Sequence, residues 1–248
     1  MADFNNYQNR AAQTGAQSGA MIDEGLRAYM LKVYNLMALG LAITGIAAFA
    51  TWQMAVADGQ LTPLGQLLFA SPLRWVVMLS PLAVVFFLSF RINKMSVSAA
   101  QATFWGYAAL MGLSLSSIFL VFTGQSIVQT FFVTAASFGA LSLYGYTTKR
   151  SLSAMGSFLI MGLFGLIIAS IVNIFLASSA LGFAISAIGV LIFAGLTAYD
   201  TQKIKEMYYD ADDATVMGRK AIMGALTLYL DFINLFTFLL QFMGNRNN

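Results

Sequence analysis

Seven apolar stretches, each about long enough to cross a lipid bilayer, follow one another along nearly the whole chain. A crossing helix needs about 20 mostly apolar residues. Only helices and closed barrels satisfy their backbone groups inside a membrane, so these runs predict an all-α membrane protein with seven transmembrane helices. The predicted spans are residues 30–56, 73–90, 99–122, 127–146, 153–177, 181–200 and 221–243.

The first residues of the chain differ from this pattern. Residues 1–24 are rich in Asn, Gln, Gly and Ala, and lack the basic start and apolar core of a cleaved signal peptide. They predict a mobile polar N-terminal tail. We therefore divide the chain into this tail and a transmembrane domain at residues 25–248.

Composition narrows the chemistry that is available. Hydrophobic residues make up 59% of the 248 residues and charged residues only 9%, which excludes a water-soluble globular protein. The chain has no cysteine and no histidine, so disulfides, thiolate nucleophiles, the commonest metal ligand and the usual pH sensor are all missing. We expect no cofactor, and any proton sensing near neutral pH would have to use a buried carboxyl group.

Basic residues predict how the helices are oriented, because Lys and Arg concentrate in cytoplasmic connections. A cytoplasmic N-terminus leaves only Arg74 and Arg246 outside, together with the C-terminus. The arrangement explains the net charge of +3 without a nucleic-acid partner. The residues placed inside are Arg10, Arg27, Lys32, Arg91, Lys94, Lys149, Arg150, Lys203, Lys205, Arg219 and Lys220.

The short connections at residues 123–126 and 177–180 carry no charge. Each predicts an antiparallel hairpin, one formed by the third and fourth spans and the other by the fifth and sixth.

Two aspartates lie within the last two apolar runs. Asp231 is in the middle of the last run and Asp200 closes the run before it. Ionisable groups inside a membrane are costly and are functional by default. At 100° per residue, Thr227 and Asn234 share a stripe with Asp231, while Thr197 shares a side with Asp200. We expect these stripes to face each other, with the last helix surrounded by the others.

If the two carboxyl groups meet, they titrate as a coupled pair. Loss of hydration and mutual repulsion then favour the protonated form of one of them. A shared proton would bridge the two helices and close a pore, whereas a deprotonated pair would repel itself and offer oxygen ligands to Ca²⁺. In the alternative, Asp231 is a packing residue hydrogen-bonded to Thr227 or Asn234.

Arg91 ends the second span at the predicted level of Asp200, so a salt bridge between them is geometrically possible. The alternative is an interfacial anchor that reaches out to the cytoplasmic surface.

Other motifs lack the residues that they need. The acidic loop with Asp210, Asp212 and Asp213 has Ala214, Thr215 and Ala221 where a calcium loop requires an oxygen ligand, Gly and Glu. Tyr199-Asp200 matches half of the signature of a two-aspartate intramembrane protease, but Gly-x-Gly does not precede Asp231. We therefore do not expect an enzyme.

Three segments together resemble a bacterial member of the Bax inhibitor family, the transmembrane Bax-inhibitor-motif proteins, which implies a location in a bacterial inner membrane. The resemblance covers nearly everything after the tail, and the two aspartate segments are its most specific part. The segments are LRAY with KVY at residues 26–34, GLTAYDTQKI at residues 195–204, and LYLDFINLF at residues 228–236.

The resemblance implies a seven-helix fold with a central last helix and a pH-sensitive Ca²⁺ leak. The paired aspartates of the family map onto Asp200 and Asp231, and its latch arginine maps onto Arg91 by position. A second functional hypothesis is a regulator of another membrane protein, such as a quality-control protease, that acts through the tail and loops.

Overall fold

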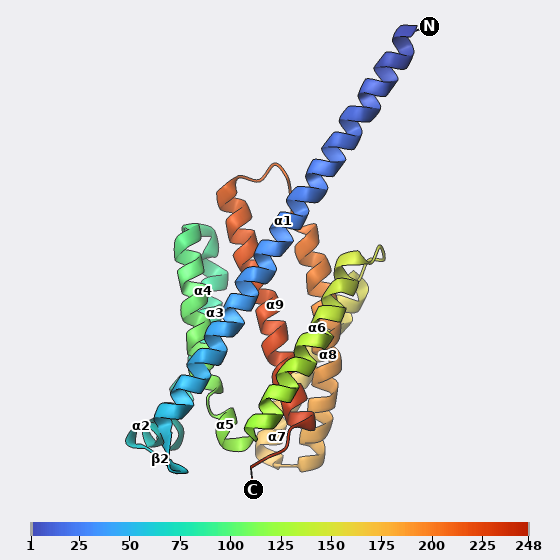
Figure 1. The fold of residues 1–248 in the computed structure, drawn as a ribbon. Coiled ribbons are helices and arrows are strands. Elements are labelled where there is room, and N and C mark those ends of the chain that lie inside the picture. The colour runs from blue at the N-terminus through green and yellow to red at the C-terminus, as the bar shows by residue number, and fades with distance from the viewer. Residues whose placement is uncertain (1, 248) are drawn as a thin grey trace.

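The computed structural model describes the backbone of residues 2–247 and the side chains of residues 23–247. Seven helices are long and apolar enough to cross a membrane, as predicted. They form a bundle with the two chain termini at opposite ends (Figure 1). The candidate spans are Asp23–Ala55, Leu73–Lys94, Val97–Val121, Gly124–Thr147, Ser153–Leu176, Ser179–Glu206 and Ala214–Met243.

These spans belong to a longer series of elements. The long helices are α1 (Ala2–Ala55), α3 (Leu73–Arg91), α4 (Val97–Leu115), α6 (Gly124–Thr147), α7 (Ser153–Leu176), α8 (Ser179–Glu206) and α9 (Ala214–Met243). The shorter elements are β1 (Val56–Ala57), β2 (Gln60–Leu61), α2 (Pro63–Gly65), η1 (Gln66–Ala70), η2 (Ile92–Lys94) and α5 (Ile118–Val121). Strands β1 and β2 form a small antiparallel hairpin.

Helix α1 continues well beyond the bundle at its N-terminal end (Figure 1). The tail predicted for residues 1–24 falls on this projecting half, and the side chains of residues 1–22 lie outside the described part. Its mobility and the cytoplasmic location of the N-terminus stay predictions.

Helix α9 is the centre of the bundle, as expected for the last helix (Figure 1). It packs against α1, α4, α6 and α8. In the most apolar stretch of α9, 61% of the residues are buried, whereas 6% are buried in the most apolar stretch of α7. The main hydrophobic core therefore forms around α9, with Leu228, Tyr229 and Phe232 among its buried members.

The predicted hairpin of the fifth and sixth spans is present, since α7 packs against α8. The contact predicted between the third and fourth spans is wrong. A turn at Ser116 and Ser117 interrupts the third span, so α4 packs on α1, α3 and α9 while α6 packs on α8 and α9. The backbone of Asn245 instead accepts a 3.0 Å hydrogen bond from the N–H of Thr123, so the C-terminal segment lies against this connection.

The last two spans extend further than predicted toward the α8–α9 connection. Helix α8 continues past Asp200 to Glu206, and α9 already begins at Ala214. These added turns contain charged residues, so the prediction from apolar runs did not include them. Asp213 caps α9 by accepting hydrogen bonds of 2.7 and 2.8 Å from the backbone N–H groups of Thr215 and Val216. Asp200 consequently lies almost two turns inside α8 rather than at its end.

Two glycines allow neighbouring helices to approach closely. A side chain at Gly145 of α6 would overlap the backbone carbonyl of Ala198 in α8. A side chain at Gly112 of α4 would likewise overlap the carbonyl of Thr44 in α1. Small residues at such crossings are typical of membrane helix packing.

Candidate functional site

Asp200 of α8 and Asp231 of α9 come together between the two helices. Their carboxyl groups lie within hydrogen-bonding reach of each other. Asp231 is only 4% exposed, and its Oδ2 atom is buried without a hydrogen-bond partner among the described groups. Two carboxylates have no donor to offer each other, so a proton on either acid would supply the missing hydrogen bond.

The acids line a cavity of about 570 Å³ between α7, α8 and α9. Thr227 and Asn234 line the same cavity, so the polar stripe predicted on the last helix faces it. The wall contributed by α7 is almost wholly apolar. It consists of Ile160, Leu163, Leu166, Ile167, Ser170, Ile171 and Ile174.

Thr227 and Asn234 do not hydrogen-bond to Asp231. The hydroxyl of Thr227 donates to the carbonyl of Met223 at 3.0 Å, and the amide of Asn234 donates to the carbonyl of Leu230 at 2.8 Å. Both side chains therefore bond to their own helix. The alternative in which they hold Asp231 as a packing residue does not match these contacts.

Thr197 is fully buried but is not among the residues lining the acid cavity. Its hydroxyl donates to the carbonyl of Phe193 at 2.7 Å, and its own carbonyl accepts from Thr201. Thr201 in turn hydrogen-bonds to Ser142 of α6 at 3.1 Å. These contacts connect this part of α8 with α6.

A second polar contact joins α8 and α9 at another level. The hydroxyl of Ser186 in α8 donates to the side-chain oxygen of Gln241 in α9 at 3.4 Å.

Lys203 is a lining residue whose role was not predicted. It lies one turn after Asp200 on α8 and lines the acid cavity, and its ammonium group is 5.9 Å from the ring centre of Tyr199. The spacing of three residues from Asp200 was the available signal, since such residues share a helix face. Among the residues that line this cavity, Lys203 is the one with a positive charge.

Arg91 is not brought to the acids. It is exposed at the end of α3, and α3 packs against α4 and η1. Within the described side chains the one ion pair joins Lys220 to Asp212. The predicted latch between Arg91 and Asp200 is therefore not formed in this structure.

The acid pair alone is a poor resident metal site. Nowhere among the described residues do three acidic side chains gather where they could hold a metal ion. Ca²⁺ takes six to eight oxygen ligands in proteins, and the cavity offers two carboxyl groups with the side-chain oxygens of Thr227 and Asn234. This donor set is smaller than the one that a resident Ca²⁺ ion takes.

The acidic loop before α9 has a structural role. Asp212 pairs with Lys220, whose ammonium group also donates to the carbonyl of Met207 at 2.9 Å. Asp213 caps the helix, and the backbone N–H groups of Val216 and Thr215 hold the pKa of its carboxyl below the usual value. These contacts connect the ends of α8 and α9.

Comparison with known proteins agrees with this architecture. Residues 26–248 match the family model described as "Inhibitor of apoptosis-promoting Bax1". An uncharacterized protein of Rickettsia prowazekii is 50% identical over 95% of this chain and 97% of its own length. The inner membrane protein YbhL of Escherichia coli is 48% identical over 90% of this chain and 93% of its own length. This integral membrane protein therefore belongs to the Bax inhibitor family.

Proposed function

We propose that the protein is a pH-sensitive leak for Ca²⁺ and that Asp200 and Asp231 are its gate. The observation that carries the proposal is the buried Oδ2 atom of Asp231, which lacks a hydrogen-bond donor beside a second carboxyl group. An unsatisfied buried polar atom costs about 1–3 kcal/mol. Such a cost at the centre of a membrane protein is a reason to look for function.

A proton shared by the pair keeps the gate closed. It forms a hydrogen bond between α8 and α9 and leaves one negative charge, with Lys203 in the same cavity to balance it. Loss of that proton places two negative charges side by side, and they repel each other. Because one acid is on each helix, the repulsion pushes α8 and α9 apart at this level.

The open pair attracts a cation. Two carboxylates and the oxygens of Thr227 and Asn234 then face one cavity and replace part of the hydration shell of Ca²⁺. The rest of the lining is largely apolar and includes Ile171, Ile174 and Phe238. Apolar constrictions exclude water until they widen, so this apolar lining forms a second barrier in the closed state. The mechanism uses no bound cofactor and no catalytic residue.

Calcium flux into proteoliposomes, measured at a series of pH values, tests the gate. We expect the flux to rise with pH, by at most about tenfold per unit if a single proton is released. Asp231→Asn cannot release a proton and keeps an N–H donor for Asp200, so its flux should be low at every pH. Asp58→Asn is the control, because Asp58 is an exposed loop acid at φ +51°, a conformation that Asn tolerates. An Asp231→Asn protein that keeps the wild-type pH profile refutes the gate.

The second candidate function is regulation of another membrane protein. The observation that favours it is the half of α1 that projects beyond the bundle, because it offers a partner a long surface (Figure 1). Deleting residues 2–22 would then abolish a cellular phenotype of the gene, while Asp200→Asn with Asp231→Asn would leave the phenotype intact. If the protein is a leak, the deletion should leave the phenotype intact and the two substitutions should abolish it.

A further inference from the structure

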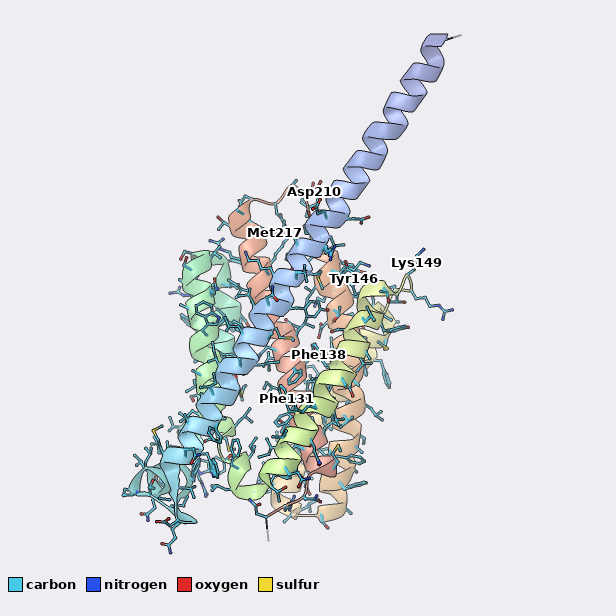
Figure 2. The ribbon with its side chains drawn as sticks, viewed as in Figure 1. Phe131, Phe138, Tyr146, Lys149, Asp210 and Met217 are labelled. Atoms are coloured by element: carbon cyan, nitrogen blue, oxygen red, sulfur yellow. The ribbon has the colours of Figure 1, made fainter. Side chains whose placement is uncertain are left out.

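A long groove lies between α1 and α6, where Phe131, Phe138 and Tyr146 of α6 are found beside α1 (Figure 2). Three cavities of about 480, 560 and 320 Å³ follow one another along it. Met37 and Phe138 line both the first and the second, and Leu41 and Phe131 line both the second and the third. The cavities are therefore neighbouring parts of one space, which we call the α1–α6 groove.

The groove is about as long as the hydrocarbon core of a bilayer is thick. Along α1 it reaches from Arg27 to Ala48, which is roughly 32 Å at 1.5 Å per residue. The hydrocarbon core of a bilayer is about 30 Å thick. The middle of the groove is lined by apolar side chains and small residues, with Phe232 of α9 contributing to its wall. A hydrocarbon chain is the ligand that such a lining suits.

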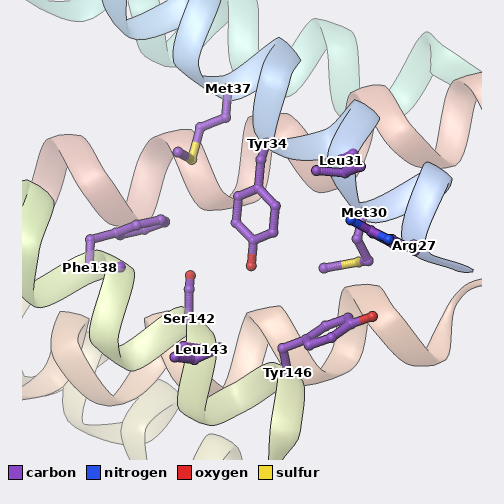
Figure 3. Close-up of a pocket in the computed structure, with 10 residues that line it drawn as sticks. Arg27, Met30, Leu31, Tyr34, Met37, Phe138, Ser142, Leu143 and Tyr146 are labelled. Carbon is purple, nitrogen blue, oxygen red and sulfur yellow. The ribbon is translucent and has the colours of Figure 1, made fainter.

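The end of the groove near Arg27 is different, because polar groups gather there. Figure 3 shows the hydroxyl of Tyr34 directed into the space between α1 and α6, with Arg27 on one wall and Tyr146 on the other. Lys205 adds a second positive charge nearby, since its ammonium group donates to the carbonyl of Tyr146 at 2.8 Å. The exposed acids Asp23 and Glu24 also lie at this end of α1 but do not line the groove.

We propose that the α1–α6 groove binds a membrane phospholipid with an anionic headgroup. The phosphate lies beside the guanidinium of Arg27, the hydroxyl of Tyr34 donates to an ester carbonyl, and one acyl chain extends past Phe138 toward Phe131. Arg is suited to phosphate because its planar group donates two parallel hydrogen bonds.

A lipid fits better than a transmembrane helix of a partner. A helix with its side chains is about 10–12 Å wide, whereas Met30, Tyr34 and Met37 reach into the groove from α1 toward Phe138 of α6 (Figure 3). These side chains leave room for a thin chain. The positive charge of Arg27 at the polar end of the groove also complements an anionic headgroup. An apolar transmembrane helix has no such group.

Two glycines make the groove testable without disturbing the protein. Gly139 of α6 and Gly45 of α1 line it, and an added Cβ atom at either position meets no other atom within 4 Å. A larger side chain there would fill the groove rather than clash with a helix. Gly165 of α7 has equally open surroundings but does not line the groove, so it is a matched control.

The experiment measures lipid binding to the purified full-length protein by native mass spectrometry and by thermal unfolding in detergent. Phosphatidylglycerol is compared with phosphatidylcholine of the same acyl chains. We expect phosphatidylglycerol to bind more tightly and to raise the melting temperature more. Arg27→Gln should reduce this preference about fivefold, the effect of one basic residue near an anionic headgroup. Lys32→Gln is the control, since Lys32 is an exposed cation on the same helix outside the groove.

Gly139→Leu should weaken binding of both lipids, because it takes the space of the acyl chain, while Gly165→Leu should leave binding unchanged. Three results would overturn the proposal: equal binding of the two lipids to the wild-type protein, wild-type lipid binding by Gly139→Leu, or the same loss of preference in Arg27→Gln and Lys32→Gln. A change of oligomeric state in Gly139→Leu without a change in lipid binding would also overturn it, since it would identify a second copy of the chain as the occupant.

Discussion

Two polar side chains on opposite faces of α9 differ in how the surrounding residues satisfy their hydrogen bonds. Tyr229 is fully buried, and its hydroxyl hydrogen-bonds to that of Thr44 at 2.6 Å. The rings of Phe104 and Tyr107 contact the Tyr229 ring edge-on, with centres 5.8 and 5.7 Å away. Asp231, two residues later, is also buried but has an oxygen without a donor and faces a cavity.

The difference distinguishes a structural polar group from a candidate functional one. At Tyr229 the hydroxyl has a partner in Thr44, and the Thr44 hydroxyl also lies 2.9 Å from the carbonyl of Ala108. Tyr229 therefore joins α1, α4 and α9 into one packed unit. At Asp231 one carboxyl oxygen lacks a donor and the side chain faces a cavity. In the proposed gate, the missing partner is a proton. Burial alone does not separate the two cases, and hydrogen-bond satisfaction does.

The largest expected effect is at the packed face. Tyr229→Ala removes a fully buried ring and should lower the free energy of unfolding by about 3–5 kcal/mol, as large-to-small substitutions in cores do. Thermal and denaturant unfolding in detergent would measure this loss. Tyr209→Ala is the control, because Tyr209 is exposed in the α8–α9 loop. A loss below about 1 kcal/mol would mean that the Tyr229 face is not the structural one.

At the cavity face, a substitution is expected to raise the free energy of unfolding rather than to lower it. Asp231→Leu has similar bulk and removes the unsatisfied oxygen, so the free energy of unfolding should rise by about 1–3 kcal/mol. The same variant should lose the pH-dependent flux, because it removes the carboxyl group of the gate. A gain in stability together with a loss of function is common when a functional residue is replaced. The comparison fails if Asp231→Leu is destabilised as strongly as Tyr229→Ala, because Asp231 would then be a structural residue too.

Thr44→Val sharpens the comparison with a smaller change. It keeps the shape of the side chain but removes the hydroxyl that contacts Tyr229 and the carbonyl of Ala108. Hydrogen bonds between membrane helices contribute about 1–2 kcal/mol or less, so the loss of stability should be in this range. Thr103→Val is the matched control, since Thr103 is only half-buried and its hydroxyl donates only to the carbonyl of Ala99, within its own helix. Equal losses of stability in the two variants would mean that the hydrogen bond within the helix, rather than the contact between Thr44 and Tyr229, provides the stabilisation.

Part of this architecture was predictable from the sequence, because membrane spans are encoded by local composition. The apolar runs gave seven spans, and the 100° periodicity of the last one placed Thr227, Asp231 and Asn234 on the face that lines the cavity. The ends of α8 and α9 were misplaced, because charged turns such as the one with Lys203 interrupt the apolar pattern while the helix continues.

Contacts between distant segments were not predictable in this way. Thr44 and Tyr229 are 185 residues apart, and neither lies in a pattern that identifies the other. The α1–α6 groove is also invisible to periodicity, because it results from two helices that both pack on α9 without covering each other. Position along the chain suggested Arg91 as a partner for Asp200, but α3 packs on α4 instead.

The smallest effect concerns Asp213, an exposed acid that caps α9 and accepts two backbone hydrogen bonds. The backbone N–H groups of Val216 and Thr215 lower the pKa of Asp213 in the folded state. A depressed pKa means that the carboxylate stabilises the fold above the unfolded value near 3.9 and that this contribution is lost as pH falls through the folded pKa.

Asp213→Asn keeps a capping oxygen but does not titrate. Its melting temperature should therefore be slightly below the wild-type value at neutral pH, and the difference should shrink as pH falls below about 4 and vanish once the pH is below the folded pKa. Asp210→Asn is the control, since Asp210 is an exposed acid of the same loop. Calcium flux should keep its wild-type pH profile in Asp213→Asn. A changed flux profile would mean that the acids near the α8–α9 loop, rather than the buried pair alone, set the pH response.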